Sequence, residues 1–154
     1  MKITIRPGLL FDVDTIAHFQ INMASETENL QLDPLIVKNG VSAVLDDPSK
    51  GKYWLAEING QVVGCLLTIP EWSDWRNGTV LWIHSVYVVP QFRKMGVFKT
   101  LYSYLKESVL RSKDLRGLRL YVDKSNQVAQ NVYHELGMNQ DHYQLFEWMK
   151  NDKS

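Results

Sequence analysis

The sequence predicts one α+β domain over residues 1–154, with a central mixed, mostly antiparallel sheet flanked by about four helices. Three observations carry this prediction. Hydrophobic periodicity switches between the strand and helix periods along the chain. Two Asn-Gly dipeptides mark tight hairpins. No repeat or low-complexity linker divides the chain, and 154 residues are enough to bury a core without disulfides or metals.

The N-terminal part of the chain predicts one strand and two helices. Apolar and polar residues alternate up to Arg6, where Pro7-Gly8 closes the strand. A helix is predicted from Asp12 to about Ser25, with apolar side chains for its buried side. Asp33-Pro34 is typical of an N-cap followed by proline at the first helical position. A second helix is therefore predicted from Pro34 to about Leu45.

Three strands joined by hairpins are predicted next. They run from Tyr53 to Ile58, from Gln61 to about Ile69, and from Thr79 to Val88. Asn59-Gly60 separates the first two, and Asn77-Gly78 precedes the third. Asparagine and glycine both tolerate the positive φ angles of a two-residue turn, so each dipeptide predicts a tight hairpin.

The C-terminal part predicts two helices and two strands. The helices are expected from Arg93 to about Arg111 and from Asn126 to Leu136, the second ending at a C′ glycine, Gly137. The strands are expected from Leu118 to Val122 and from Tyr143 to Met149.

Composition excludes several classes of function. The 17 basic and 17 acidic residues cancel, so the electrostatic footprint of a nucleic-acid-binding protein is missing. Cys65 is the only cysteine, which excludes an intrachain disulfide and a cysteine-based zinc site, and its apolar neighbours predict a small buried side chain. No apolar run approaches the ~20 residues of a membrane span, and the N-terminus has no signal-peptide core. We therefore expect a cytoplasmic protein that uses no metal.

The junction from Val86 to Phe98 is the most informative segment. A β-branched run stops at Pro90, a short basic segment with one glycine follows, and an amphipathic helix begins. A helix N-terminus gathers unpaired N–H groups and a partial positive charge, which suits a pyrophosphate. Arg93 and Lys94 are cations at the positive end of the helix dipole, where they are unfavourable. Their presence there therefore favours an anion-binding role.

Two motifs and the order of elements resemble the GCN5-related N-acetyltransferases (GNAT). Arg93-x-x-Gly96 after a strand ending at Val88 is similar to the family's acyl-CoA-binding motif. Asn126-x-x-Ala129-x-x-x-Tyr133-x-x-x-Gly137 resembles its second CoA-contacting helix. The order β-α-α-β-β-β-α-β-α-β matches the family fold over nearly the whole chain.

The resemblance implies that acetyl-CoA is the cosubstrate. Phe98 departs from the family, which usually has glycine or alanine there to let the helix approach the diphosphate. The strand backbone would pair with pantetheine and the acyl carbonyl. The implied CoA contacts are Val86, Tyr87, Val88, Arg93, Lys94, Met95, Gly96, Val97, Phe98, Asn126, Ala129 and Tyr133.

Acetyl transfer to an amine needs a proton donor for the thiolate and a base for the amine. By resemblance, Tyr133 donates the proton, although a tyrosine at this helical spacing is often a core residue. For Asn126, a simple N-cap is the alternative to a CoA contact. Where several family members carry a catalytic glutamate this chain has Trp82, which makes His84 the nearest titratable group.

An unbroken ladder from a two-residue Asn77-Gly78 turn would place Glu71 opposite His84, on the sheet face of Val86. The carboxylate would then raise the pKa of the imidazole and fix its tautomer, as suits a base. A cross-strand ion pair without catalytic part is the alternative, and Pro70 could shift the register by one residue.

Two acidic sets are candidates for binding the acceptor. Trp72, Asp74 and Trp75 would attract and stack on a cationic amine, or else cover a sheet edge or a homodimer contact. Glu26 and Glu28 fall in the predicted connection between the first two helices, which lines the acceptor pocket in the family. A solvated loop is their alternative.

The resulting functional prediction is acetyl transfer to a primary amine of a small molecule or peptide. A catalytically idle acyl-CoA-binding module is the alternative, and a structural dimer module without CoA binding is a third possibility.

Overall fold

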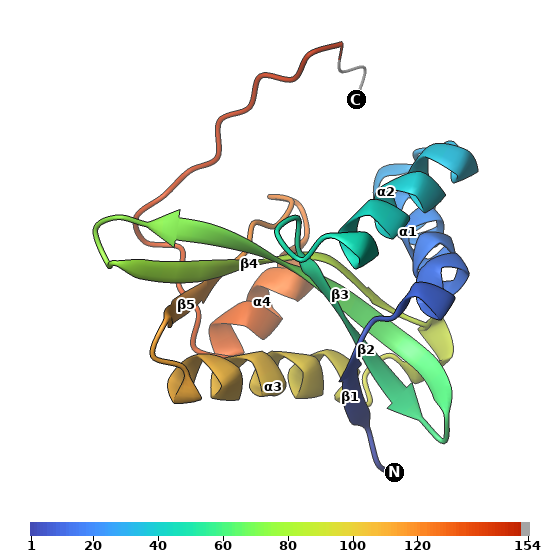
Figure 1. The fold of residues 1–154 in the computed structure, drawn as a ribbon, viewed down its shortest axis with the longest axis horizontal. Helices are drawn as coiled ribbons and strands as arrows, with labels where there is room; N and C mark the ends of the chain where they lie inside the picture. The colour runs from blue at the N-terminus through green and yellow to red at the C-terminus, as the bar shows by residue number, and fades with distance from the viewer. Residues whose placement is uncertain (152–154) are drawn as a thin grey trace. The chain divides into compact units, whose positions relative to one another are not determined.

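The computed structural model of the protein describes residues 1–151, and its chain divides into two units, Met1–Leu120 and Tyr121–Ser154. The first unit holds a five-stranded sheet in the order β1-β2-β3-β4-β5, two short 3₁₀ turns and three helices (Figure 1). The described part of the second unit, up to residue 151, holds one helix. The elements are β1 (Thr4–Pro7), η1 (Leu10–Asp12), α1 (Val13–Glu28), α2 (Pro34–Asp46), β2 (Lys52–Ile58), β3 (Gln61–Ser73), β4 (Gly78–Val88), η2 (Pro90–Phe92), α3 (Val97–Arg111), β5 (Leu115–Arg119) and α4 (Gln127–Glu135).

The sheet is mixed, as predicted. Strands β1 to β4 are antiparallel neighbours in chain order, and β5 joins the edge parallel to β4. Asn59 and Gly60 connect β2 to β3 with φ angles of 51° and 77°, the conformation of a type I′ turn. This Asn-Gly prediction is confirmed.

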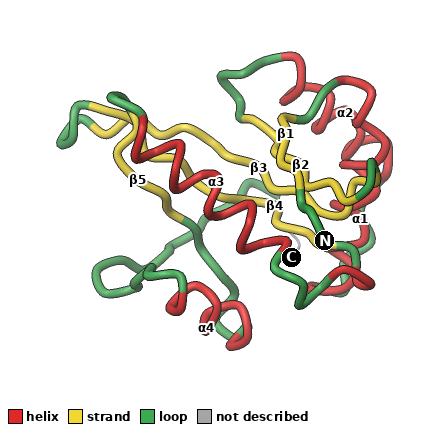
Figure 2. The backbone as a smooth tube through the Cα atoms, turned by 90° about the horizontal axis from the view of Figure 1, so that it is seen from below, coloured by secondary structure: helices red, strands yellow, loops and turns green. Residues whose placement is uncertain are grey.

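The helices of the first unit cover both faces of its sheet (Figure 2). On one face, α1 and α2 build the largest core, a cluster of Ile16, Ala17, Phe19, Val41, Tyr53, Leu55, Cys65, Leu67 and Tyr87. On the other face lies α3, whose Tyr104 ring packs 5.1 Å from that of Trp54. Cys65 is fully buried, and burial raises the pKa of its thiol to about 12, so the predicted apolar role is confirmed.

Two helix boundaries differ from the prediction. Helix α1 continues to Glu28, and Asn29 ends it with a φ of 52°. Glu26 and Glu28 therefore lie in the last turn of a helix, not in a connecting loop. Helix α3 begins at Val97 rather than Arg93, because Lys94 and Gly96 adopt positive φ angles that interrupt helical geometry. Helix α2 begins as predicted, with the Asp33 side chain accepting from the Leu35 amide at 2.9 Å.

Two strand predictions are wrong. Strand β5 covers Leu115–Arg119 instead of residues 118–122, since Arg116 donates to the carbonyls of Arg76 and Asn77 (both 3.0 Å) and fixes the earlier start. Residues 143–149 form no strand. A strand needs a neighbour for its backbone groups, and no described strand pairs with this segment.

Helix α4 in the second unit matches its prediction closely. The Asn126 side chain accepts from the Ala129 amide at 3.0 Å and caps the N-terminus. Gly137, with a φ of 91°, ends the helix, and the Met138 amide donates to the Tyr133 carbonyl at 3.0 Å. This is a Schellman motif. No helix among the described residues is long and apolar enough to cross a bilayer.

Candidate active site

A β-bulge interrupts strand β4 at Ser85. Leu67 of β3 stands opposite His84, but Cys65 stands opposite Tyr87, so Ser85 and Val86 share the position across from Leu66. Ser85 has a φ of 55°, in the left-handed region. A bulge bends a strand and turns its side chains, and bulges are common next to active sites. The bulge also corrects a prediction, because His84 shares its sheet face with Tyr87 and not with Val86.

Beyond the bulge, β4 has a strand neighbour on one side only. Its pairing with β5 ends at Trp82 and Arg119, and no other described strand takes that edge. The Val89 amide donates to the Val63 carbonyl of β3 at 2.8 Å. Because backbone groups alternate along a strand, the amides of Val88 and Val86 then point to the opposite edge. That edge can pair with an extended acyl chain.

The open edge of β4 leads into a cradle of amide groups. The first intrahelical bond of α3 runs from the Thr100 amide to the Gly96 carbonyl at 2.9 Å, so the amides of the first turn, those of Val97 and Lys99 among them, lie at the helix N-terminus and precede this bond. A Cβ built on Gly96 meets nothing within 4 Å. The turn therefore combines helix N–H donors with open space, and its residues fit a diphosphate.

The side chains around the cradle leave the space at Gly96 open. The half-buried Phe98 ring lies along α3, 6.3 Å from that of Tyr102. Lys94 and Met95 are exposed on the loop. Phe98 thus extends along the flank of α3, while Gly96 remains open.

Arg93 faces helix α1. Its Nε donates to the Val88 carbonyl and its Nη2 donates to Glu26 Oε2, both at 2.8 Å. Its guanidinium carbon lies 5.4 Å from the centre of the Tyr87 ring. The Tyr87 hydroxyl donates to Glu26 Oε1 at 3.2 Å. These contacts tie the end of β4, the start of the cradle and the last turn of α1 together.

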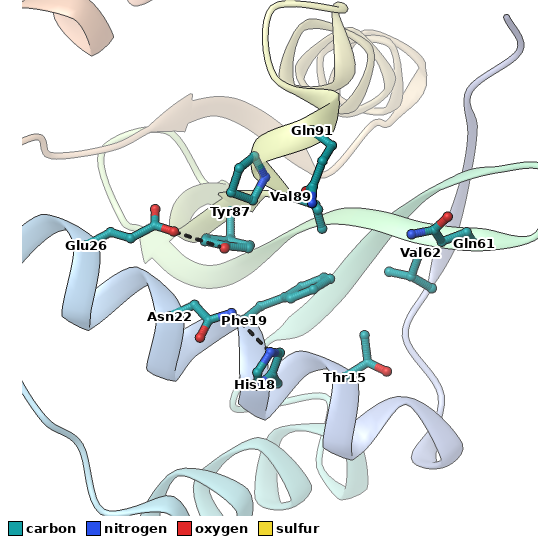
Figure 3. A pocket seen from close by; sticks show the side chains of 11 residues that line it. Thr15, His18, Phe19, Asn22, Glu26, Gln61, Val62, Tyr87, Val89 and Gln91 are labelled. Carbon is teal, nitrogen blue, oxygen red and sulfur yellow. Dashed lines mark hydrogen bonds between the residues drawn. The ribbon is translucent and has the colours of Figure 1, made fainter.

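A pocket of about 560 Å³ lies beside this network, between α1 and the end of β4 (Figure 3). Its lining includes Glu26 and Tyr87, which are joined by their hydrogen bond, and a second pair, His18 and Asn22, whose Nε2 and Nδ2 atoms are 3.1 Å apart. Among the predicted acceptor residues, only Glu26 lines it.

The predicted Glu71–His84 pair is wrong. Glu71 stands opposite Val80, and its Oε1 accepts from Arg119 Nη1 at 3.0 Å. The hairpin does not close at Asn77-Gly78, because Gly78 has already entered β4 and pairs with Ser73. A four-residue loop, Asp74–Asn77, makes the turn and shifts the register of the ladder.

The environment of His84 also reverses the expected pKa shift. The imidazole lies 6.2 Å from the Trp82 ring in a stacked arrangement. Partial burial lowers its pKa, since desolvation disfavours the charged ring. His84 is therefore neutral around pH 7 and has the protonation state of a base.

The predicted acceptor residues do not gather in one place. Trp72 and Trp75, exposed to 65% and 89%, stand with Asp74 at the hairpin end of β4. Glu26 lies at the other end of β4, bound to Arg93. The hairpin end presents an aromatic and acidic surface, while Glu26 belongs to the network beside the cradle.

Helix α4 carries the remaining candidates. Asn126 acts as the N-cap, with its side-chain oxygen already bound to the Ala129 amide. Tyr133 is half-buried, and burial raises the pKa of its phenol, which keeps it protonated at neutral pH. A protonated phenol can donate a proton to a departing thiolate. No three His, Cys, Asp or Glu side chains in the described residues are grouped to hold a metal ion.

The acetyltransferase (GNAT) family model matches residues 17–138. The chain belongs to the GNAT family. It is similar to a possible acetyltransferase from Clostridium difficile 630, at 40% identity over 99% of this chain and 100% of that one, with a TM-score of 0.91. No curated protein matches.

Two further solved structures share the GNAT fold at lower identity. A ribosomal-protein-alanine N-acetyltransferase from Brucella melitensis biovar Abortus 2308 is 15% identical over 97% of this chain and 100% of that one, with a TM-score of 0.79. AAC(6')-Iy in complex with the bisubstrate analogue CoA-S-monomethyl-acetylneamine is 17% identical over 97% and 99%, with a TM-score of 0.75. At these identities the likeness concerns the fold alone.

Sequence reasoning missed two features of this GNAT site. Ser85 is a small polar residue within a β-branched run, which gives only a weak signal for a bulge. The Glu26–Arg93 contact joins residues 67 positions apart, and no local pattern could reveal it.

Proposed function

We propose that this GNAT protein transfers an acetyl group from acetyl-CoA to a primary amine of a small molecule or peptide, by direct attack in a ternary complex. One observation carries the proposal: the bulged β4 has an open edge that leads directly into the amide cradle at Gly96. An extended pantetheine with a diphosphate at one end fits such a surface.

Each step of the proposed reaction is assigned to a different group of the protein. The amides of Val86 and Val88 at the open edge would hold the pantetheine and the acyl carbonyl, whose oxygen gains negative charge during attack. An amine with a pKa near ~10 arrives protonated, and His84 would accept its proton directly or through water. Tyr133 would return a proton to the departing thiolate, whose thiol has a pKa of about 8.5.

The acceptor is proposed to be cationic. Trp72, Asp74 and Trp75 offer aromatic faces and a carboxylate at one exposed place, which suits an ammonium group. Two structural neighbours are consistent with an amine acceptor: one is a ribosomal-protein-alanine N-acetyltransferase, and the other is bound to a CoA-S-monomethyl-acetylneamine analogue. The same exposed tryptophans would also suit a homodimer contact.

An idle acyl-CoA-binding module is the second candidate. The separation of Glu71 from His84 favours it, because the carboxylate predicted to activate the imidazole stands opposite Val80 instead. A thiol-release assay with acetyl-CoA and a panel of polyamines, amino acids, aminoglycosides and lysine peptides separates the two. Amine-dependent release supports the transferase, whereas CoA binding without release for any amine supports the idle module.

A further inference from the structure

We propose that Glu26 is a positioning residue of the CoA site, which acts by holding Arg93 in the orientation that ties the cradle to β4. The inference rests on the proposed function. It assigns Glu26 to the cosubstrate side of the reaction, whereas its position near the start of the α1–α2 connection suggested the acceptor side.

The orientation of Arg93 is fixed on three sides. Nε donates to the carbonyl of Val88, Nη2 donates to Glu26, and the planar group lies over the Tyr87 ring. A guanidinium is a rigid planar fork, so contacts at two edges and one face leave it a single orientation. Because Val88 ends β4, this orientation fixes where the loop before Gly96 leaves the strand.

The position of Glu26 on α1 is unfavourable for a carboxylate unless hydrogen-bond donors surround it. Glu26 lies in the last turn of α1, and a carboxylate is unfavourable near the negative end of a helix dipole. The Tyr87 hydroxyl and Arg93 each donate to one of its oxygens. The side chains of Arg93 and Glu26 are 43% and 39% exposed, so the ion pair contributes little to global stability. Its loss should change the position of Arg93 and leave the fold intact.

This geometry predicts the direction in which CoA affinity changes when the Glu26 charge is removed. Arg93, neutralised by Glu26, orients the loop, and the backbone amides of the cradle receive the diphosphate. Without the Glu26 charge, the bond from Arg93 loses its ionic part, and the attachment of the cradle to α1 weakens. CoA binding should weaken. The opposite result is expected if Glu26 competes with a CoA phosphate for Arg93. Removing the Glu26 charge would then strengthen CoA binding.

The test is calorimetric titration of CoA into the full chain carrying Glu26→Gln, together with steady-state kinetics. We expect CoA affinity to fall about three- to tenfold and the KM for acetyl-CoA to rise by the same factor, with kcat, the amine KM and the melting temperature unchanged. Asp14→Asn is the matched control, since Asp14 also lies on α1 and forms an exposed ion pair with Lys38 (3.1 Å). It should change none of these quantities.

Tyr87→Phe provides a second variant, because it removes one of the two donors to Glu26 and should produce a smaller loss of CoA affinity. Unchanged or tighter CoA binding by Glu26→Gln overturns the inference, as does a rise confined to the amine KM. CoA binding by the wild type together with an unchanged Glu26→Gln variant retains the proposed function and rejects the positioning role. Absence of CoA binding by the wild type rejects both.

Discussion

The Arg93 Nε atom donates a hydrogen bond to the carbonyl oxygen of Val88 at 2.8 Å, which closes the turn between β4 and the amide cradle. The motif arginine therefore bonds within the protein, and the proposed anion site consists of backbone groups around Gly96. This division leads to different expectations for substitutions at the two positions.

Gly96→Asp should weaken CoA binding about a hundredfold or more, because it places a negative charge where the diphosphate would lie, and like charges in contact cost several kcal/mol. Arg93→Ala should cost much less. Gly96→Asn is the matched control, since asparagine tolerates the φ of 83° and carries no charge. Titration calorimetry with CoA measures all three. Equal affinity of the Asp and Asn variants would place the anion elsewhere.

Tyr133→Phe should lower kcat by roughly 10²–10⁴ with little change in CoA affinity, as expected on removing a general acid. Burial already keeps the phenol protonated by raising its pKa. Tyr104→Phe serves as the control, because Tyr104 packs on Trp54 in the first unit. A wild-type kcat in the Tyr133 variant would make it a core residue only.

The pH–rate profile tests His84. Burial lowers the pKa of the imidazole, so the neutral base persists below the usual value of about 6.5 and the acidic limb of kcat/KM should lie below that pH. His84→Gln should remove or move this limb, whereas the exposed His134→Gln should not. If the His84 variant keeps the wild-type acidic limb, another group is the base.

Asp12 should matter for stability in a pH-dependent way. The buried carboxylate accepts from Arg6 Nη1 and Nη2 at 2.8 and 2.9 Å and from the Leu9 amide at 2.8 Å. The Arg6 hydrogen bonds are the main cause that lowers its pKa, so the stabilisation is present above the unfolded value of about 3.9 and is lost as pH falls through the folded one.

Asp12→Asn should therefore lower the free energy of unfolding by about 1–3 kcal/mol at pH 7, and the difference from wild type should shrink below about pH 4. Urea denaturation at several pH values measures this, with the exposed Asp14→Asn as control. A pH-independent difference would mean that packing, not charge, explains the effect.

The sequence predicted the fold well wherever residues close together in the chain determine the backbone conformation. Asn59-Gly60, the Asp33 cap and the Gly137 C-terminus act over a few residues and are all confirmed. Asn77-Gly78 is the same dipeptide as the first turn, yet the Arg116 side chain donates to the backbone carbonyls of residues 76 and 77, and Gly78 belongs to the strand. Contacts between residues distant in the sequence therefore determined the position of this second turn.

The candidate site was predictable in its location and less so in its details. The strand–loop–helix junction at Gly96 follows from sequence pattern and resemblance. The Ser85 bulge reversed which residues share a face with His84, and a single inserted residue has this effect because side chains alternate with a period of two. The Glu71–Arg119 and Glu26–Arg93 pairs each join distant segments and carry no local signal.

The most direct test of the account is incubation of the protein with ¹³C-labelled acetyl-CoA and the amine panel, followed by mass spectrometry of the amines and measurement of free CoA. The account predicts that at least one amine gains a single labelled acetyl group in step with CoA release, and that Gly96→Asp abolishes both at the same acetyl-CoA concentration. Bound CoA with no labelled amine, and release no faster than without protein, would contradict it.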